Sequence, residues 1–315
     1  MNFRLVRSRL LSLIPVLLVV SVASFSLLQF LPGSPAAVIL GTDATNSQIA
    51  QLNHQLGVDR PIVAQYLSWL SHAVEGRLGN SVINGQSVVS LIWTRLPVTL
   101  SLAAVGMVLA LIGGVGLGLT AALRPGGHGD RGVSLLSAVG LSLPGFWVAI
   151  LLVIPLAIWT RAFPATGYVP LGTNPFEWLR SIALGSLALS VAPGAAIARH
   201  TQRALVAAMS QDFVRAARAR GLSHFQALIR HGLKNASIPV VTISSFHFAT
   251  LMGGAVVVEQ IFGLNGVGQL LISSVQDHDL PVVQGVVVVI SLLVIAVNLG
   301  TDLIYSVLDP RVRLA

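Results

Sequence analysis

The sequence of 315 residues contains no cysteine and only one lysine, Lys234. Without cysteine the chain can form neither disulfides nor a thiolate nucleophile, and it lacks the ligands of zinc–thiolate and iron–sulfur sites. Because Lys234 is followed by Asn235, the phosphate-binding loop GxxxxGK[ST] cannot occur. The chain therefore does not hydrolyse nucleotides by that route.

Catalytic and metal-binding patterns are also missing. The eight histidines show no HExxH or other ligand spacing, and GVG at residues 266–268 lacks the third glycine of a dinucleotide-binding fingerprint. We interpret the acids Asp277 and Asp279 as solvated loop charges, because isolated charged groups are usually exposed. The sequence thus argues against an enzyme.

Charged residues are scarce, at 10% of the chain against about 25% in a typical soluble domain. Hydrophobic residues make up 54%, and the mean hydropathy is +0.81. These values predict a polytopic membrane protein. The net charge of +8 then reflects first the retention of Lys and Arg on the cytoplasmic side of the membrane, and not a nucleic-acid partner.

Six apolar runs are candidate membrane spans, because about 20 helical residues cross the hydrocarbon core of a bilayer. The first run is longer than the roughly 7–15 apolar residues of a signal peptide. No convincing cleavage site follows it, so we expect a retained helix. The six runs cover residues 10–31, 96–123, 132–160, 181–198, 238–258 and 282–308.

Basic residues are distributed unevenly between the segments that connect these spans. The four segments on the side of the N-terminus hold 14 of the Lys and Arg residues, and the three on the other side hold 5. The positive-inside rule therefore places both termini in the cytoplasm. The cytoplasmic segments are 1–9, 124–131, 199–237 and 309–315, and the outer segments are 32–95, 161–180 and 259–281.

This topology divides the chain into a cytoplasmic end with the first span at 1–31, an outer segment at 32–95 and a membrane core at 96–315. In the outer segment, apolar residues recur at helical spacing in SQIAQLNHQLG and again in PIVAQYLSWLSHAV. This spacing predicts two short amphipathic helices on the outer surface. After the fifth span, the glycines of IFGLNGVGQLL favour a re-entrant or surface-lying segment; they are Gly263, Gly266 and Gly268.

Two glycine pairs within the expected spans indicate close helix packing. Gly114 and Gly118 form a GxxxG pair in the second span, and small residues at this spacing let two helix backbones approach; a hinge role is the alternative. Gly253 and Gly254 in the fifth span are expected to admit a neighbouring helix in the same way.

The stretch QDFVRAARARGLSHFQALIRHGLKNASIPV, residues 211–240, concentrates basic charge in an otherwise apolar chain. Gly221 stands where a helix needs a left-handed closing residue, and Ser223 with Gln226 forms an S-x-x-Q capping box. The pattern predicts two helices with a sharp joint between them. The second helix is expected to carry an apolar stripe of Leu222, Phe225, Leu228, Ile229 and Leu233.

A basic amphipathic helix in the cytoplasm has three interpretations. It is an anchor on the lipid surface, a solvated positive-inside loop, or a plug that fits a groove on a partner. Composition alone favours the solvated loop. The joint at Gly221 favours the docking element, because a fixed angle between two helices serves the transmission of force and hardly matters for topology.

The segment RAARARGLSHFQALIRHGLKNASIPVV resembles the EAA loop of permease subunits of ATP-binding-cassette importers, with two alanines, three residues and then Gly221. Arg215 stands where the motif's name has Glu, and Pro239 lies later than in the general pattern. Both departures are familiar in the peptide and nickel branch, and the long outer segment resembles the first of its two permeases, the dipeptide/oligopeptide type. Further segments similar to that branch are LQFLPGSPA, LGVDRPIVAQYLSWL, RLGNSV, SLPGFW, FPATGYVPL, GGAVVVEQIFGLNGVGQLL and LDPRVR.

The resemblance implies an all-α polytopic membrane protein with six transmembrane helices and the type I importer permease fold, in the inner membrane of a prokaryote. It implies no cofactor in this chain, because ATP and Mg would bind two partner ATPase subunits. By this analogy residues 222–232 are the coupling helix that enters a cleft on an ATPase subunit, and residues 203–220 are its lever. The coupling residues so assigned are Arg215, Ala216, Ala217, Gly221, Leu222, Ser223, Phe225, Gln226, Leu228 and Ile229.

The expected function is import of di- or oligopeptides by this chain, a second homologous permease, the ATPases and an extracytoplasmic peptide-binding protein, which would contact segments 32–95 and 259–281. Import of nickel, glutathione or another small solute remains open. An ion-coupled carrier or channel, and a membrane-anchored scaffold, are alternatives from other classes. For the carrier only His247 and Asp302 lie within spans, and we interpret them as a hydrogen-bonded helix residue and an interface-reaching side chain.

Overall fold

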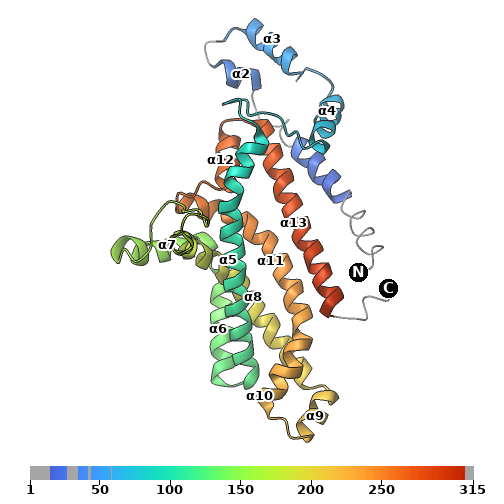
Figure 1. The fold of residues 1–315 in the computed structure, drawn as a ribbon, viewed down its shortest axis with the longest axis vertical. Coiled ribbons are helices and arrows are strands. Elements are labelled where there is room, and N and C mark those ends of the chain that lie inside the picture. The colour runs from blue at the N-terminus through green and yellow to red at the C-terminus, as the bar shows by residue number, and fades with distance from the viewer. Residues whose placement is uncertain (1–14, 27–34, 42–43, 58, 309–315) are drawn as a thin grey trace. The chain divides into compact units, whose positions relative to one another are not determined.

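The computed structural model describes residues 15–26, 35–41, 44–57 and 59–308, and most of these residues are helical (Figure 1). Within these ranges the β pairing is confined to an isolated bridge between Asn80 and Ser87. The prediction of an all-α protein is confirmed. The basic segments 1–9 and 309–315, and much of the run 10–31, lie outside the described residues.

The chain forms two compact units, which two long helices share. The first unit comprises Met1–Pro97 and Gly266–Ala296, and the second comprises Val98–Asn265 and Val297–Ala315. Helices α5 (Val88–Leu123) and α13 (Leu280–Leu308) contribute residues to both.

Four helices among the described residues are long and apolar enough to cross a membrane. Each includes one of the expected runs and begins a few residues before it. The described part of the first run is a helix of 12 residues, Pro15–Ser26. The four long helices are α5, α8 (Pro175–Met209), α11 (Leu233–Ile261) and α13.

The run 132–160, expected as one continuous span, is broken. Helices α6 (His128–Ser142) and α7 (Gly145–Val153), the latter continued by the π-helix η1 (Ile154–Trp159), are bent by 99° relative to each other. The break falls at Pro144, which has no N–H to donate and forces the preceding residue into an extended conformation. The described residues therefore hold four spans, or five if the bent pair counts as one.

Helix α8 is the centre of the second unit, where it packs against α6, α7 and α11 (Figure 1). Gly114 and Gly118 of α5 also lie against α8. A Cβ at Gly114 would be 2.7 Å from the carbonyl oxygen of Gly194, and one at Gly118 would be 2.6 Å from Cβ of Thr201. These distances leave no room for a side chain, so the GxxxG pair brings the two backbones together as predicted.

The second glycine pair behaves differently. A Cβ at Gly254 would lie 3.2 Å from Cδ2 of Leu189 on α8, which is a close helix contact. A Cβ at Gly253 would meet no described atom of this chain within 4 Å. Packing within the chain therefore involves Gly254, because adjacent helical residues point about 100° apart, and the expectation for Gly253 stays a prediction.

The first unit contains the two amphipathic helices predicted in the outer segment, α3 (Asn46–Leu56) and α4 (Ile62–Val74), after the short α2 (Pro35–Leu40). Thr45 begins α3 with a capping box to Gln48. Between the two helices, a 2.6 Å hydrogen bond to His54 holds the pKa of Asp59 below its usual value. The helix α12 (Val267–Gln276) accounts for the glycine-rich segment after the fifth span.

The core of the first unit joins the start of α5, α12 and the start of α13. Its buried residues come from segments that are far apart in the sequence, so it fixes these three helices and the loop before α5 to one another. The buried residues of this core are Leu78, Val88, Leu91, Ile92, Val267, Leu270, Val282 and Val286.

The interpretation of Asp279 as a solvated loop charge is wrong. Its side chain is only 3% exposed, whereas Asp277 is exposed. The Asp279 carboxylate accepts a hydrogen bond from the Ser81 hydroxyl and one of 3.2 Å from the backbone N–H of Val82. It is therefore not a solvated loop charge but the acceptor that ties the loop before α5 to the start of α13.

Candidate functional site

The jointed basic loop is the first candidate site. After α8 ends at Met209, the chain forms α9 (Asp212–Ala219) and turns at Gly221, whose φ of +98° is in the region that favours glycine. The N–H of Gly221 donates to the carbonyl of Arg218 at 2.9 Å, which closes α9. The predicted joint is present (Figure 1).

The second half of the loop begins with the predicted capping box. The backbone N–H of Gln226 donates to Oγ of Ser223 at 3.2 Å, and the N–H of Ser223 donates to the Gln226 side-chain oxygen at 3.0 Å. Helix α10 (His224–Ala227) follows and continues through the π-helix η2 (Leu228–Gly232) into α11. The two short elements together cover the segment predicted as one docking helix.

The apolar stripe predicted on this helix divides between two faces. Leu228 is fully buried and, with the half-buried Leu233, packs against Leu205 of α8. Phe225 and Ile229, in contrast, are 55% and 38% exposed. The five residues span a wide arc of the helix, so one edge of the arc packs against the protein and the other edge is exposed. The expectation of a single stripe is therefore wrong.

Helix α9 shows the same division. Ala217 is buried, whereas Ala216 and Arg215 are exposed. The Arg215 guanidinium pairs with the Asp212 carboxylate at 3.5 Å, and both side chains are more than two-thirds exposed. Such an ion pair contributes little to stability. Arg215 thus remains accessible where the motif's name has Glu.

The outward surface of the loop combines aromatic and cationic groups. Phe213 is 44% exposed and Phe225 is 55% exposed, and Arg218, Arg220 and Arg230 are exposed as well. His224 adds a buried ring nitrogen, Nε2, that has no hydrogen-bond partner among the described residues. An apolar cleft with acidic groups around it would complement this surface. No sequence pattern distinguishes His224 from the other loop histidines.

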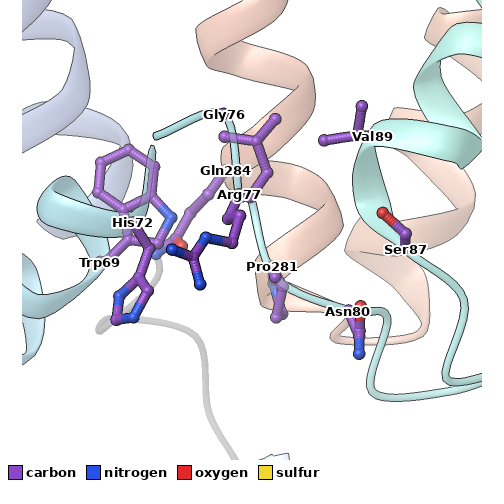
Figure 2. A pocket seen from close by; sticks show the side chains of 11 residues that line it. Trp69, His72, Gly76, Arg77, Asn80, Ser87, Val89, Pro281 and Gln284 are labelled. Carbon is purple, nitrogen blue, oxygen red and sulfur yellow. The ribbon is translucent and has the colours of Figure 1, made fainter. Parts of the chain in front are cut away.

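A cavity of about 530 Å³ in the first unit is the second candidate site. Figure 2 shows Trp69, His72 and Arg77 on one side and Ser87 and Val89 opposite them. The cavity lining also includes the start of α13, with Gln284 only 8% exposed. Nε1 of Trp69 is buried and has no partner among the described residues. The cavity therefore offers hydrogen-bond donors to a ligand group, including the Arg77 guanidinium, which also pairs with the Glu75 carboxylate.

Two polar contacts between helices of the second unit were not predicted. The hydroxyl of Thr99 donates to the fully buried Glu259 at 2.5 Å, and Ser245 donates to Asn298 at 2.7 Å. Glu259 follows the expected end of the fifth span by one residue, so its burial was not apparent from the sequence. His247 lies 3.4 Å from the Thr250 hydroxyl within the same helix, in keeping with a hydrogen-bonded helix residue.

Residues 114–314 match the family of inner membrane components of binding-protein-dependent transport systems, and residues 1–103 match the N-terminal region of such membrane components. The chain belongs to this family. It is a permease subunit, and an ion-coupled carrier or a scaffold is no longer needed to account for its spans. The permease is the membrane component of such a system and not its ATPase.

Relatives align with the permease over nearly its whole length. It is 39% identical, over 98% of both chains, to a putative peptide transport system permease protein of Brucella abortus. It is 38% identical, over 97% of both chains, to a probable peptide ABC transporter permease protein of Sinorhizobium fredii. It is 35% identical, over 98% of both chains, to the oligopeptide transport system permease protein AppB of Bacillus subtilis.

A solved structure supports the fold. The permease aligns with a chain of the MetNI methionine ABC transporter in its inward-facing conformation, with a TM-score of 0.54 and 22% identity. The alignment covers 70% of the permease and 96% of that chain. The permease therefore has the fold of an ABC importer membrane subunit.

Proposed function

We propose that this permease imports di- or oligopeptides that an extracytoplasmic binding protein delivers. Three relatives of full length carry peptide or oligopeptide transport in their names, which supports this substrate class. The chain would lie in the inner membrane of a prokaryote with six spans and both termini in the cytoplasm. The first of these spans would be the run 10–31, and the distribution of basic residues supports the orientation.

The jointed loop is the proposed site of coupling to ATP hydrolysis, and the observation that carries this role is its division into a buried and an exposed face. Leu228 and Leu233 anchor α10 and η2 to α8, while Phe225 and Ile229 point away from the core. A partner that grips the exposed face would therefore pull on α8 and α11 directly. Two ATPase subunits, which bind ATP and Mg, are the partners that this role requires.

Transport would follow from a shift between two conformations. ATP-driven closure of the ATPases moves their clefts, and each cleft holds one coupling helix. The ATPases bind the inward-open and outward-open states with different affinity, and this difference drives the shift between them. A second, homologous permease would complete the pathway, as the resemblance of the jointed loop to importer permeases implies.

The outer surface is the proposed contact for the binding protein. Segments 32–95 and 259–281 face the extracytoplasmic side in this topology, and the cavity beside Trp69 and Arg77 lies on the first of them. An acidic side chain of the binding protein would find the Arg77 guanidinium and the Trp69 indole N–H there. Charge complementarity of this kind mainly raises the association rate.

The substrate class is tested by uptake into vesicles that contain the complete transporter, with the binding protein added outside. We expect ATP-dependent accumulation of a labelled tripeptide. Unlabelled tripeptide should compete, whereas nickel and glutathione should not. If only nickel or only glutathione competes, that solute is the substrate. Uptake in the absence of ATP would refute the proposal of an ATP-driven importer.

A further inference from the structure

Helix α4 is held to the rest of the first unit by one face only. The hydroxyl of Tyr66 lies 2.8 Å from that of Ser21 in helix Pro15–Ser26, and the Tyr66 ring contacts Phe25 edge-on at 5.5 Å. Trp69 joins the same aromatic cluster, 6.3 Å from Phe25. None of the 13 residues of α4 is fully buried.

A second apolar face of α4 has no contact that covers it among the described residues. Val63, Leu67, Leu70 and Val74 recur at helical spacing i, i+4, i+7 and i+11, and we call them the α4 stripe. Val63 is 64%, Leu67 56% and Val74 81% exposed, and Leu70 is half-buried. The polar residues occupy the opposite side; they are Gln65, Ser68, Ser71 and His72.

An apolar stripe of this length is unfavourable in water. A helix of about 12–15 residues is marginal by itself, and tertiary packing of its apolar face normally provides most of its stability. The aromatic cluster covers one side of α4 and leaves the stripe exposed. Another medium or molecule must therefore cover it.

The bilayer is the cover that the neighbouring surfaces indicate. Helix Pro15–Ser26, to which α4 is bound, exposes Val19 and Val22 at 69% and 46%, and in a membrane protein such side chains face lipid. Helix α4 contains no Lys, Arg, Asp or Glu, and it carries Trp69 and Tyr66, residues that concentrate at membrane–water interfaces. The stripe thus lies on an uncharged helix that is bound to a helix with lipid-facing side chains.

Helix α3 differs from α4 in each of these respects. Its apolar residues Ile49 and Leu52 are half-buried, and most of its other residues are polar. We propose that α4 alone is an interfacial helix, which inserts the α4 stripe into the outer leaflet beside the first span. This inference rests on the proposed topology. Trp69 and His72 belong to α4 and also line the cavity, so lipid that holds α4 would also hold this part of the cavity wall in place.

The absence of cysteine allows a direct test with single labels. Val63→Cys, Leu67→Cys and Val74→Cys each receive an environment-sensitive fluorophore in the full-length chain. The chain is reconstituted in phosphatidylethanolamine and phosphatidylglycerol vesicles that contain phosphatidylcholine spin-labelled near the headgroup. We expect quenching at the stripe about twofold or more above that at Ser68→Cys and Ser71→Cys on the polar side, and at Ser47→Cys on α3.

Equal quenching at stripe and polar positions would overturn the proposal. So would quenching of the stripe that disappears only when the second permease or the binding protein is added, because protein would then be its cover. A second measurement does not depend on labels, since Arg77 follows the end of α4 as a trypsin site, whereas the bond after Arg60 leads to Pro61 and is not cleaved. The pair Val63→Asp and Leu67→Asp should speed cleavage from outside, and Ser68→Asp with Ser71→Asp should not; equal rates would contradict lipid insertion. If the protein does not import peptides, the quenching and the trypsin cleavage should still be as expected. The interfacial helix and the peptide-import function can therefore be refuted independently.

Discussion

Gly221 determines the angle between α9 and α10 by its backbone conformation alone. A Cβ there would meet no described atom within 4 Å, so the cost of Gly221→Ala comes from its φ of +98°. Left-handed backbone costs an L-residue about 1–2 kcal/mol, which corresponds to a factor of about 5–30. We expect a loss of that size in peptide-stimulated ATPase activity of the assembled transporter.

The matched control for this substitution is Gly132→Ala in α6. That glycine also faces open space, but it has helical backbone, so alanine causes no strain. Equal activity of the two variants would show that the joint at Gly221 does not matter for coupling.

Asp279 offers a second test at the residue scale. In Asp279→Ala the hydroxyl of Ser81 and the N–H of Val82 lose their acceptor, which costs about 1–3 kcal/mol. Asp277→Ala removes an exposed carboxylate two residues away and should change stability by no more than about 0.5 kcal/mol. Thermal unfolding in detergent compares them, and equal midpoints would mean that the buried contact does not stabilise the loop.

These residues also show how far the sequence predicts a site. Gly221 and the capping box of Ser223 with Gln226 depend on neighbours within a few residues, and the structure contains both features. The environment of Asp279 could not be inferred, because its partner Ser81 is 198 positions away. The buried hydrogen bond of Glu259 could not be predicted for the same reason, because its partner Thr99 lies 160 positions before it in the sequence.

At the scale of elements, α10 and η2 have an anchoring face and a presenting face, and substitutions separate them. Phe225→Glu alters an exposed side chain and should leave the unfolding midpoint unchanged while it reduces co-purification of the ATPase. Leu228→Ala empties a buried site and should cost about 2–5 kcal/mol of stability. If Phe225→Glu retains the ATPase fully in well-folded protein, the docking role of this face is wrong.

Three glycines of helix α5 allow a comparison of packing within one element. Gly118→Ala would place a Cβ 2.6 Å from Thr201, and such overpacking typically costs about 1–3 kcal/mol. Gly113→Ala and Gly116→Ala meet no described atom and should be neutral or slightly stabilising. Unfolding midpoints of the purified chain measure the difference, and a Gly118 variant as stable as the controls would remove the close crossing with α8.

Helix existence was easier to predict than helix continuity. The apolar runs locate α5, α8, α11 and α13, because apolar length alone identifies a helix that can cross a bilayer. The bend between α6 and α7 was missed, although Pro144 lies at the break. A membrane helix tolerates proline when neighbouring groups satisfy the freed backbone, so proline by itself does not predict a break. In α5, α8 and α11 a proline lies within a continuous helix.

At the scale of the whole molecule, different proteins of the transporter would recognise the substrate, form the membrane pathway and hydrolyse ATP. The described spans offer few polar side chains, so substrate specificity would reside in the binding protein that docks on the outer surface. The interfacial helix α4 would keep that docking surface at the membrane. The jointed loop would receive the force of ATP hydrolysis from the ATPases on the opposite side.

The measurement that tests this account most directly is peptide uptake by the complete transporter in vesicles, compared between the natural chain and Phe225→Glu. The account predicts uptake that needs both the binding protein and ATP. In Phe225→Glu, uptake should fall at least about tenfold while assembly of the two permeases is preserved, a loss equivalent to about 1.4 kcal/mol of coupling. Phe225→Leu, which keeps an apolar group, should retain most of the activity. Full uptake by Phe225→Glu, or uptake driven by an ion gradient without ATP, would contradict the account.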